Sequence, residues 1–231
     1  MLKLKCDIFK ITPVFLISFF WYIHMTVRSK SSQKWLQEHH RDRYVKRAQE
    51  DGYRSRASYK LIELNQKDSV FKAGSIVVDL GAAPGGWSQV AIKLVGSKGK
   101  VIASDILSMN PIDDVNFILG DFTDSIVLQN ILDSLEKDLV DLVISDMAPN
   151  MSGIRGVDQT KAMYLVELAL DMASEILKPG GNFVVKAFHG EGFDQYMLEL
   201  KKRFKRVTSR KPNASRSRSR EVYVVAKDFK R

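Results

Sequence analysis

The sequence contains a single cysteine, Cys6, among its 231 residues, and this scarcity excludes two kinds of protein. One thiol cannot build a disulfide framework within the chain, and it cannot supply a metal site made of several cysteines. Histidine is also scarce: of the four in the chain, none stands at a metal-ligand spacing or pairs with a candidate nucleophile. We therefore expect no metal centre.

The sequence also lacks an apolar run long enough to cross a membrane as a helix. The most apolar stretch, residues 11–23 (ITPVFLISFFWYI), follows three lysines and resembles the core of a signal peptide. A membrane-spanning helix needs about 20 apolar residues, however, and no small-residue cleavage site follows this stretch. A mitochondrial presequence would be rich in arginine, but no arginine precedes Arg28. We expect a cytoplasmic protein without a stable membrane partner.

Acidic residues are fewer than basic ones, 27 against 36, which leaves a formal charge of +9. Two stretches gather the basic residues: positions 28–60 hold ten Lys and Arg against four acids, and positions 201–220 hold ten with no acid. Apolar residues make up 45% of the chain and charged residues 27%, which is ordinary for a folded protein. A folded chain with this charge indicates a polyanionic partner, either nucleic acid or a membrane surface.

No internal repeat or linker interrupts the chain, and apolar runs typical of buried strands alternate with amphipathic runs typical of helices. The strands are predicted at 75–80, 100–105, 115–121, 139–146, 182–188, 204–210 and 221–226, and the helices at 32–50, 56–66, 87–95, 125–137, 159–177 and 193–204. Lys178-Pro179-Gly180-Gly181 should end the longest helix. This alternation predicts an α/β domain with a parallel sheet covered on both faces.

A glycine-rich turn, GAAPGG at residues 81–86, follows the first predicted strand, but it lacks the G-x-G-x-x-G spacing of dinucleotide binders. Taken alone, such a turn can be purely structural. Aspartates also lie at the ends of four predicted strands: Asp79, Asp105, Asp121 and Asp146. Since ligands of open α/β sheets bind at the carboxyl ends of strands, this set favours a nucleoside ligand without a pyrophosphate.

Four segments now resemble a known family: DLGAAPGGWSQV, SDMAPNMSG, KPGGNFVVKAF and SREVYVV. They are similar to the FtsJ/RrmJ family of S-adenosylmethionine-dependent ribosomal RNA 2′-O-methyltransferases, and the match is close to its bacterial members that modify a uridine in the A-loop of large-subunit ribosomal RNA. The resemblance runs from about Met25 to Asp228, and MTVRSKSSQKWLQEHH resembles the beginning of such a protein. We therefore expect Met25 to be the true start, residues 1–24 to be a dispensable extension or signal-like segment, and residues 25–231 to form one methyltransferase domain with basic N-terminal helices.

The resemblance implies a fold and a cofactor. It implies a Rossmann-like sheet of seven strands in which the last strand, here 221–226, is antiparallel. It also implies S-adenosyl-L-methionine, with Gly85 and Trp87 in the turn, Asp105 at the ribose, Asp121 at the adenine amine and Asp146 beside the methionine part.

The family's catalytic group falls on Lys60, Asp146, Lys186 and Glu221, all present without substitution. Each of them alone has an ordinary interpretation as a solvated charge, a turn cap or an ion-pair partner. Chemistry supports the catalytic interpretation, because a ribose 2′-OH is weakly acidic and a base must take its proton as the new C–O bond forms. Lys186 ends an apolar strand whose carboxyl end should face the cofactor, and a neutral amine there can serve as that base.

The basic stretches each end at one of these residues, Lys60 or Glu221, so we expect both to flank one pocket and to contact phosphates, which position RNA without reading its sequence. The residues chosen for this role are Arg54, Arg56, Lys211, Arg216, Arg218 and Arg220. The expected partner is ribosomal RNA within the large subunit, bound by a monomer. Other substrates, namely tRNA or an mRNA cap, remain open, as does a non-catalytic ribosome-assembly factor; a nicotinamide dehydrogenase is a distant third possibility.

Overall fold

The computed structural model describes residues 42–231, which begin with two helices, α2 (Arg43–Glu50) and α3 (Ser58–Asp68). Asp42 caps α2, because its carboxylate accepts a hydrogen bond from the backbone N–H of Tyr44 at 2.9 Å. The helices predicted at 32–50 and 56–66 therefore appear at 43–50 and 58–68. Residues 32–41 of the first prediction, the segment 1–24 and the proposed start at Met25 lie outside the described residues.

The predicted alternation of strands and helices is confirmed in order and type. The elements after α3 are β1 (Ile76–Leu80), α4 (Gly86–Val95), β2 (Lys100–Asp105), β3 (Val115–Leu119), α5 (Ser125–Ser134), β4 (Val140–Ser145), α6 (Arg155–Ile176), β5 (Leu177–Phe188), α7 (Phe193–Arg203), β6 (Phe204–Arg210) and β7 (Glu221–Phe229).

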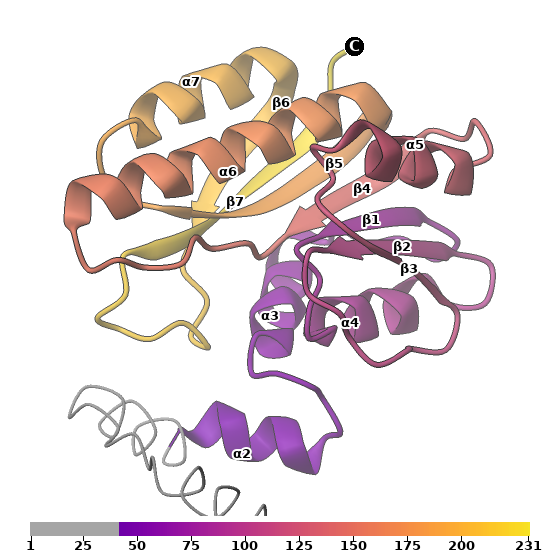
Figure 1. The fold of residues 1–231 in the computed structure, drawn as a ribbon, viewed down its shortest axis with the longest axis horizontal. Coiled ribbons are helices and arrows are strands. Elements are labelled where there is room, and N and C mark those ends of the chain that lie inside the picture. The colour runs from indigo at the N-terminus through magenta and orange to yellow at the C-terminus, as the bar shows by residue number, and fades with distance from the viewer. Residues whose placement is uncertain (1–41) are drawn as a thin grey trace, which may run out of the picture. The chain divides into compact units, whose positions relative to one another are not determined.

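The seven strands form one sheet in the order β3-β2-β1-β4-β5-β7-β6 (Figure 1). Strand β7 is antiparallel to both of its neighbours, β5 and β6, whereas the pairs from β3 to β5 are parallel. The predicted single antiparallel strand is thus the last one. The order in which strands are added to the sheet reverses between β1 and β4, and such a switch point is where open α/β sheets bind ligands.

Helices cover both faces of the sheet: α3 and α4 lie on one side, and α5, α6 and α7 on the other (Figure 1). Alternate residues of a strand point to opposite faces. In β1, Val77 therefore packs with α3 and α4, while Val78 packs under α5 and α6. No helix between residues 42 and 231 is long and apolar enough to span a membrane.

The boundary between α6 and β5 differs from the prediction. The helix ends at Ile176, but the chain passes directly into β5 at Leu177, five residues before the expected strand. Leu177 pairs with Val140 and Asn182 with Leu142, so a register shift absorbs the exposed Lys178-Pro179-Gly180 as an irregularity within the strand. The predicted stop signal, Lys178-Pro179-Gly180-Gly181, does mark the end of the helix. Leu177 belongs to the sheet because it pairs with Val140, which is a tertiary contact. Helix α6 also starts earlier than predicted, at Arg155.

Candidate active site

Strand register brings together three of the four residues implied by the family resemblance. Lys186 of β5 pairs with Tyr223 of β7, and Phe188 pairs with Glu221. The side chains of Lys186, Glu221 and Tyr223 alternate with those of Val222 and Val224, which pack on the opposite face under α6 and α7. They therefore point to the side of the sheet covered by α3, which carries Lys60. Asp146 follows directly after β4, the strand beside β5.

The charged groups form a connected line. Lys60 Nζ lies 2.8 Å from Glu221 Oε1, and Lys186 Nζ lies 3.1 Å from Asp146 Oδ1. Lys186 also donates to the backbone carbonyl of Asp146. Both lysines are buried, each with 8% of its surface exposed. Buried charges of this kind persist only when they are paired, and here the two amines face two carboxylates.

Tyr223 joins the two ion pairs and was missed from the sequence. Its hydroxyl accepts a hydrogen bond from Lys60 Nζ at 2.9 Å and donates one to Asp146 Oδ1 at 2.7 Å. The ring is fully buried, and its centroid lies 5.7 Å from that of Trp87. A signal was present: in the run EVYVVA, Tyr223 stands two positions after Glu221 and so shares its face of the strand.

The cluster favours ionised carboxylates. Burial alone raises the pKa of Asp146, but the positive charges of Lys186 and then Lys60 outweigh it and bring the pKa below its usual value. The pKa of Glu221 is likewise lowered: burial opposes this, and the charge and hydrogen bond of Lys60 dominate. The pKa of Tyr223 is raised well above its ordinary value, first by burial and then by the charge of Asp146. Tyr223 therefore stays a hydroxyl donor.

The glycine-rich turn after β1 lies beside Asp146. Leu80 pairs with Ser145, so Gly81 and Asp146 follow neighbouring strand ends. A Cβ on Gly81 would collide with the side chain of Met147, and Gly81 has a φ of +72°, so only glycine fits. Gly85, with a φ of +103°, precedes α4. The first-turn N–H groups of a helix have no acceptor within it and can meet a ligand.

Asp105 and Asp121 extend this edge across β2 and β3. The carboxylate of Asp105 accepts from the backbone N–H of Ala83 and of Leu107, each at 2.8 Å, which ties the strand end to the turn. Asp121 follows β3 and accepts from the N–H and the hydroxyl of Thr123, at 2.9 and 2.7 Å. Carboxylate oxygens accept more than one hydrogen bond, so both groups can also bind hydroxyls or amines of a ligand.

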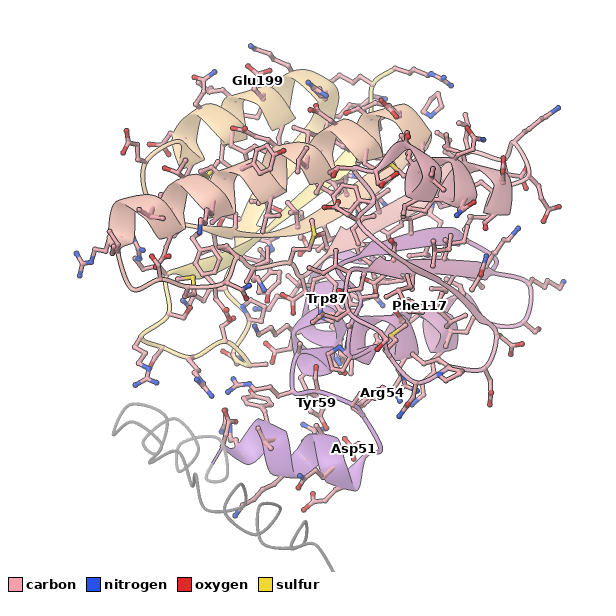
Figure 2. All side chains as sticks on the ribbon, in the orientation of Figure 1. Asp51, Arg54, Tyr59, Trp87, Phe117 and Glu199 are labelled. Carbon is pink, nitrogen blue, oxygen red and sulfur yellow. The ribbon has the colours of Figure 1, made fainter. Side chains whose placement is uncertain are left out.

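Two residues from the turn region lie deeper than a ligand contact requires. Asp79 is completely buried and accepts from the Ser88 hydroxyl at 2.7 Å, while burial raises its pKa to about 7. The side chain of Trp87 is 3% exposed and donates to the carbonyl of Ala57 at 2.9 Å (Figure 2). What Trp87 can offer a ligand is its backbone N–H in the first turn of α4.

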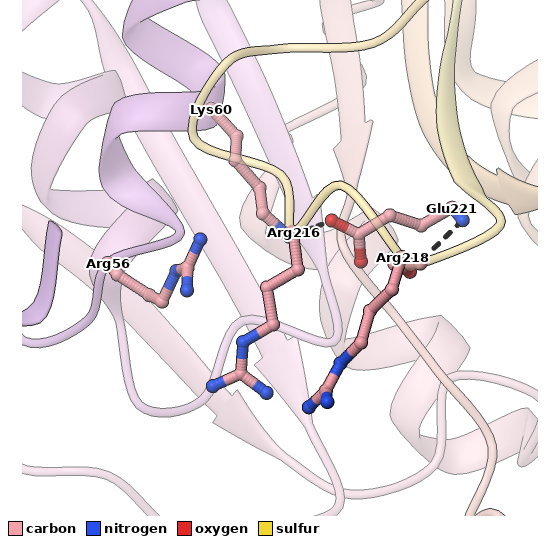
Figure 3. A pocket seen from close by; sticks show the side chains of 6 residues that line it. Arg56, Lys60, Arg216, Arg218 and Glu221 are labelled. Atoms are coloured by element: carbon pink, nitrogen blue, oxygen red, sulfur yellow. Dashed lines mark hydrogen bonds and ion pairs between the residues drawn. The ribbon is translucent and has the colours of Figure 1, made fainter. Parts of the chain in front are cut away.

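A basic cavity of about 450 Å³ opens at Lys60 and Glu221. Four basic residues and one carboxylate line it, together with Ser219: Arg56, Lys60, Arg216, Arg218 and Glu221 (Figure 3). Arg216 and Arg218 point the same way from the loop before β7, and Arg56 comes from the other side (Figure 3). Burial and the charge of Arg216 lower the pKa of Arg56, so this charge balance favours an anionic ligand.

The loop before β7, residues 211–220, is anchored around this cavity. Arg56 donates to the carbonyl of Ala214, and Glu63 of α3 accepts from the N–H groups of Asn213 and Ala214 at 2.6 and 3.1 Å. Lys211 donates to the carbonyls of Ser219 and, at 3.1 Å, Glu221. Arg220 turns instead toward the carbonyl of His189, at 3.4 Å.

The basic stretch 201–220 does not act as one surface. Phe204 pairs with Phe229 at the end of the sheet where β5 begins, and Arg210 pairs with Tyr223 near the cavity. Lys201, Lys202 and residues 203–206 therefore lie at the edge opposite the cluster, and only the second half of the stretch borders the cavity. Both basic stretches thus reach the cavity, through Arg56 and Lys60 and through Arg216 and Arg218, while β6 carries the first half of the second stretch to the other edge of the sheet.

Arg54 occupies an unexpected place. Its guanidinium donates to the carbonyls of Pro84 at 3.2 Å, Asn110 at 2.6 Å and Pro111 at 2.6 Å. These acceptors lie in the glycine-rich turn and in the loop after β2, on the Asp105 side of the edge.

Comparison with known proteins decides the family, because residues 53–229, most of the described chain, match the FtsJ-like methyltransferases. The chain belongs to the FtsJ-like methyltransferase family. A ribosomal RNA large subunit methyltransferase E of Cellvibrio japonicus is 65% identical over 202 residues, covering 87% of this chain and 96% of that protein. The protein of the same name from Marinobacter nauticus is 61% identical over 203 residues, covering 88% and 98%.

A crystal structure described as a ribosomal RNA methyltransferase of Plasmodium falciparum has the same fold as this methyltransferase. Its TM-score is 0.69 at 31% sequence identity, and the match covers 77% of this chain and 98% of that one. The predicted fold class, family and methyltransferase activity are thus confirmed. The positions predicted for the catalytic group are neighbours in the fold, and their individual roles remain predictions.

Proposed function

We propose that this methyltransferase transfers a methyl group from S-adenosyl-L-methionine to the ribose 2′-OH of a uridine in the A-loop region of large-subunit ribosomal RNA. The observation that carries the proposal is the continuity of the site: the carboxylates of Asp105 and Asp121, the Lys60–Tyr223–Asp146–Lys186 line and the basic cavity follow one another along one edge of the sheet. The names of the relatives support ribosomal RNA as the substrate.

The residues at the carboxyl edge fit this cofactor. Asp105 and Asp121 offer carboxylate oxygens to ribose hydroxyls and an adenine amine, and Asp146 offers a negative charge to a sulfonium and an ammonium. The glycines of the turn leave room for close approach of a ligand to the backbone before α4. When bound, S-adenosyl-L-methionine supplies an electrophilic methyl carbon, so the chain itself needs to supply a base and an oriented nucleophile.

Lys186 is placed to take the proton, and for this step it must first lose the proton that it carries in its ion pair with Asp146. A neutral amine has two N–H donors and one lone pair, and the carboxylate and the backbone carbonyl of Asp146 accept the two donors. The lone pair is then directed away from Asp146 and can receive the 2′-OH proton. With S-adenosyl-L-methionine bound, Lys186 Nζ would hold the 2′-OH proton, and the cofactor would supply its methyl carbon to the 2′ oxygen and keep the electron pair of its carbon–sulfur bond. Lys60 and Glu221 hold the opposite end of the line and balance its charge.

The basic cavity is suited to hold the RNA backbone. Arg56, Arg216 and Arg218 line its wall next to Lys60, and three guanidinium groups can neutralise neighbouring phosphates. Phosphate contacts fix the position of the ribose without reading the base, so the choice of uridine and of the large subunit rests on the relatives. On this proposal the enzyme works as a monomer in the cytoplasm, where ribosomal subunits are assembled.

Transfer of labelled methyl from S-adenosyl-L-methionine to isolated large ribosomal subunits tests the proposal. Small subunits and tRNA serve as alternative acceptors, and digestion to nucleosides identifies the methylated ribose. Lys186→Ala removes the proposed base and should slow transfer by about 10²–10⁴-fold. Lys186→Arg keeps the charge without a usable lone pair and should be similarly slow. Lys178→Ala, an exposed lysine on the same strand, is the matched control.

Two results would contradict the proposal in different ways. Absence of transfer to large subunits by the wild-type protein would refute the assigned substrate, and labelled tRNA would replace it with another RNA. Full activity of a folded Lys186→Ala protein would refute the assignment of the base while leaving the reaction in place. Cofactor and subunit binding without any transfer would indicate a non-catalytic assembly factor.

A further inference from the structure

The loop between β2 and β3 covers one side of the glycine-rich turn. It begins directly after Asp105 and carries two apolar side chains into solvent, Ile106 at 68% and Leu107 at 63% exposure. A Cβ added to Gly85 would lie 2.7 Å from Ile112 Cδ1 and 3.1 Å from Met109 Sδ, so the loop presses against the turn. The position of this loop therefore determines the shape of the edge near Asp105.

Arg54 fastens this loop to the turn. One guanidinium nitrogen, Nη1, donates to Asn110 O at 2.6 Å and to Pro84 O at 3.2 Å, and the other, Nη2, donates to Pro111 O at 2.6 Å. The backbone N–H of Arg54 donates to the Gln89 side chain on α4 at 2.8 Å, which fixes the base of the arginine. A single residue from the α2–α3 segment, labelled in Figure 2, thus binds three carbonyls from two other segments.

These acceptors suit a guanidinium and no other side chain. Three carbonyl oxygens converge on one cation, and the planar fork of arginine reaches separated acceptors with fixed geometry, whereas a lysine ammonium is a single point. Arg54 contrasts with Arg56, Arg216 and Arg218, which line the basic cavity. The donors of Arg54 are directed at backbone oxygens on the Asp105 side of the edge.

We propose that Arg54 is a positioning residue for the cofactor half of the site and contributes little to the binding of RNA phosphates. It holds the β2–β3 loop against the turn, and so fixes Asp105 and the apolar side chains that follow it. The inference rests on the proposed function, because it takes the Asp105 edge to be the cofactor site. It assigns Arg54 a role different from the RNA contact predicted from its place in a basic stretch.

Affinities measured separately for the two ligands test the proposal. Calorimetry with S-adenosylhomocysteine reports the cofactor half, and binding to large ribosomal subunits over a range of salt concentrations reports the phosphate contacts. Arg54→Ala should weaken S-adenosylhomocysteine binding by about tenfold or more, since it removes charge-assisted hydrogen bonds. Its affinity for subunits and the salt dependence should stay within about twofold of wild type. Arg218→Ala is the matched control, with the opposite pattern expected.

The conservative variant Arg54→Lys distinguishes the geometry of the guanidinium group from its positive charge. Arg54→Lys keeps the positive charge but reaches one carbonyl segment only, so it should resemble Arg54→Ala in cofactor affinity. If Arg54 contacted a phosphate, Arg54→Ala would bind large subunits more weakly than wild type and with a weaker dependence on salt concentration. Arg54→Lys would then bind subunits more tightly than Arg54→Ala, because it keeps the positive charge. Either result, or unchanged cofactor affinity in Arg54→Ala, overturns the proposal.

Hydrogen exchange of the ligand-free protein gives a readout that does not depend on the identity of the cofactor. Amides of residues 106–114 should exchange faster in Arg54→Ala than in wild type, while those of the loop 211–220 should not change. Equal exchange in the 106–114 loop would overturn the proposal. If the wild-type protein does not bind S-adenosylhomocysteine, but residues 106–114 still exchange faster in Arg54→Ala than in wild type, the proposed cofactor is refuted and the role of Arg54 in holding the loop stands.

Discussion

Replacing Tyr223 by phenylalanine removes one oxygen atom from the centre of the charged line and leaves the rest of the side chain in place. The ring keeps its packing against Trp87, but Lys60 loses an acceptor at 2.9 Å and Asp146 loses a donor at 2.7 Å. Lys60 still faces Glu221, and Asp146 still faces Lys186. The substitution therefore removes one hydrogen bond from each of two buried charged groups, and each of them keeps its ion-pair partner.

The expected cost follows from these contacts. A hydrogen bond to a charged group contributes about 1.5–3 kcal/mol, and both lost bonds involve charged groups that keep a second partner. We expect the free energy of unfolding to fall by about 2–3 kcal/mol, and the melting temperature to fall by about 5–10 °C for a chain of this size. Tyr196→Phe is the control, since that buried hydroxyl donates to the neutral carbonyl of Val166 at 3.0 Å and should cost about 1 kcal/mol.

The pH dependence distinguishes the two variants further. The pKa of Asp146 is low because the charges of Lys186 and Lys60 and the Tyr223 bond outweigh burial, so its ionisation stabilises the folded protein above the unfolded pKa. This contribution is lost as the pH falls through the folded pKa. In Tyr223→Phe the folded pKa of Asp146 rises toward its unfolded value, so the loss of stability on acidification should be smaller than in wild type or in Tyr196→Phe and should end at a higher pH.

Urea unfolding from about pH 7 down to about pH 3 measures both effects. If Tyr223→Phe costs no more than Tyr196→Phe, and both lose as much stability on acidification as wild type, then Tyr223 is a packing residue and the charged line is not a connected unit. Methyl transfer by the folded variant should also fall, because Lys60 and Asp146 lose their common link.

Two further predictions concern groups outside the line. Burial, and then the charges of Asp146 and Asp105, raise the pKa of Asp79 to about 7 despite the hydrogen bond from Ser88. The contribution of Asp79 to stability therefore falls as the pH rises from about 4 to about 7. In urea unfolding, Asp79→Asn should become more stable relative to wild type across that range, and a difference that stays constant with pH would contradict this. Glu63→Gln removes the carboxylate that accepts from Asn213 and Ala214, so subunit binding should weaken by several-fold while S-adenosylhomocysteine affinity, measured by calorimetry, stays constant.

The sheet was predictable because its strands are short apolar runs between turn signals. β2 matches its predicted bounds, and β1 and β3 differ from theirs by one or two residues. Burial on both faces makes such strands nearly continuous in apolar residues, so the pattern is local and strong. The boundary at Leu177 was not predictable, because its pairing with Val140 is a tertiary contact that overrides the adjacent Pro179 and Gly180.

The sequence motifs predicted the charged residues of the site, but they did not predict which residues these charges contact. Lys60, Asp146, Lys186 and Glu221 were predicted because they stand at the catalytic positions of the motifs that resemble the family, whereas Tyr223 looks like any aromatic residue in a strand. Arg54 and Arg56 are two positions apart in one basic stretch, yet one reaches the β2–β3 loop and the other the basic cavity. Sequence gives the charge of a residue, while the direction of its side chain depends on which loop folds against it.

The place of β7 in the sheet has a consequence for how the enzyme is made. The last strand in the chain inserts between β5 and β6, and it carries both Glu221 and Tyr223. Until it has emerged, β5 has an unpaired edge, β6 has no strand to pair with, and Lys60 has neither of these partners. Chains fold from the N-terminus during synthesis, so a nascent methyltransferase can assemble β1 to β4 early but gains its complete site only after β7 has emerged from the ribosome. A ribosome stalled before β7 has emerged would therefore hold an inactive chain.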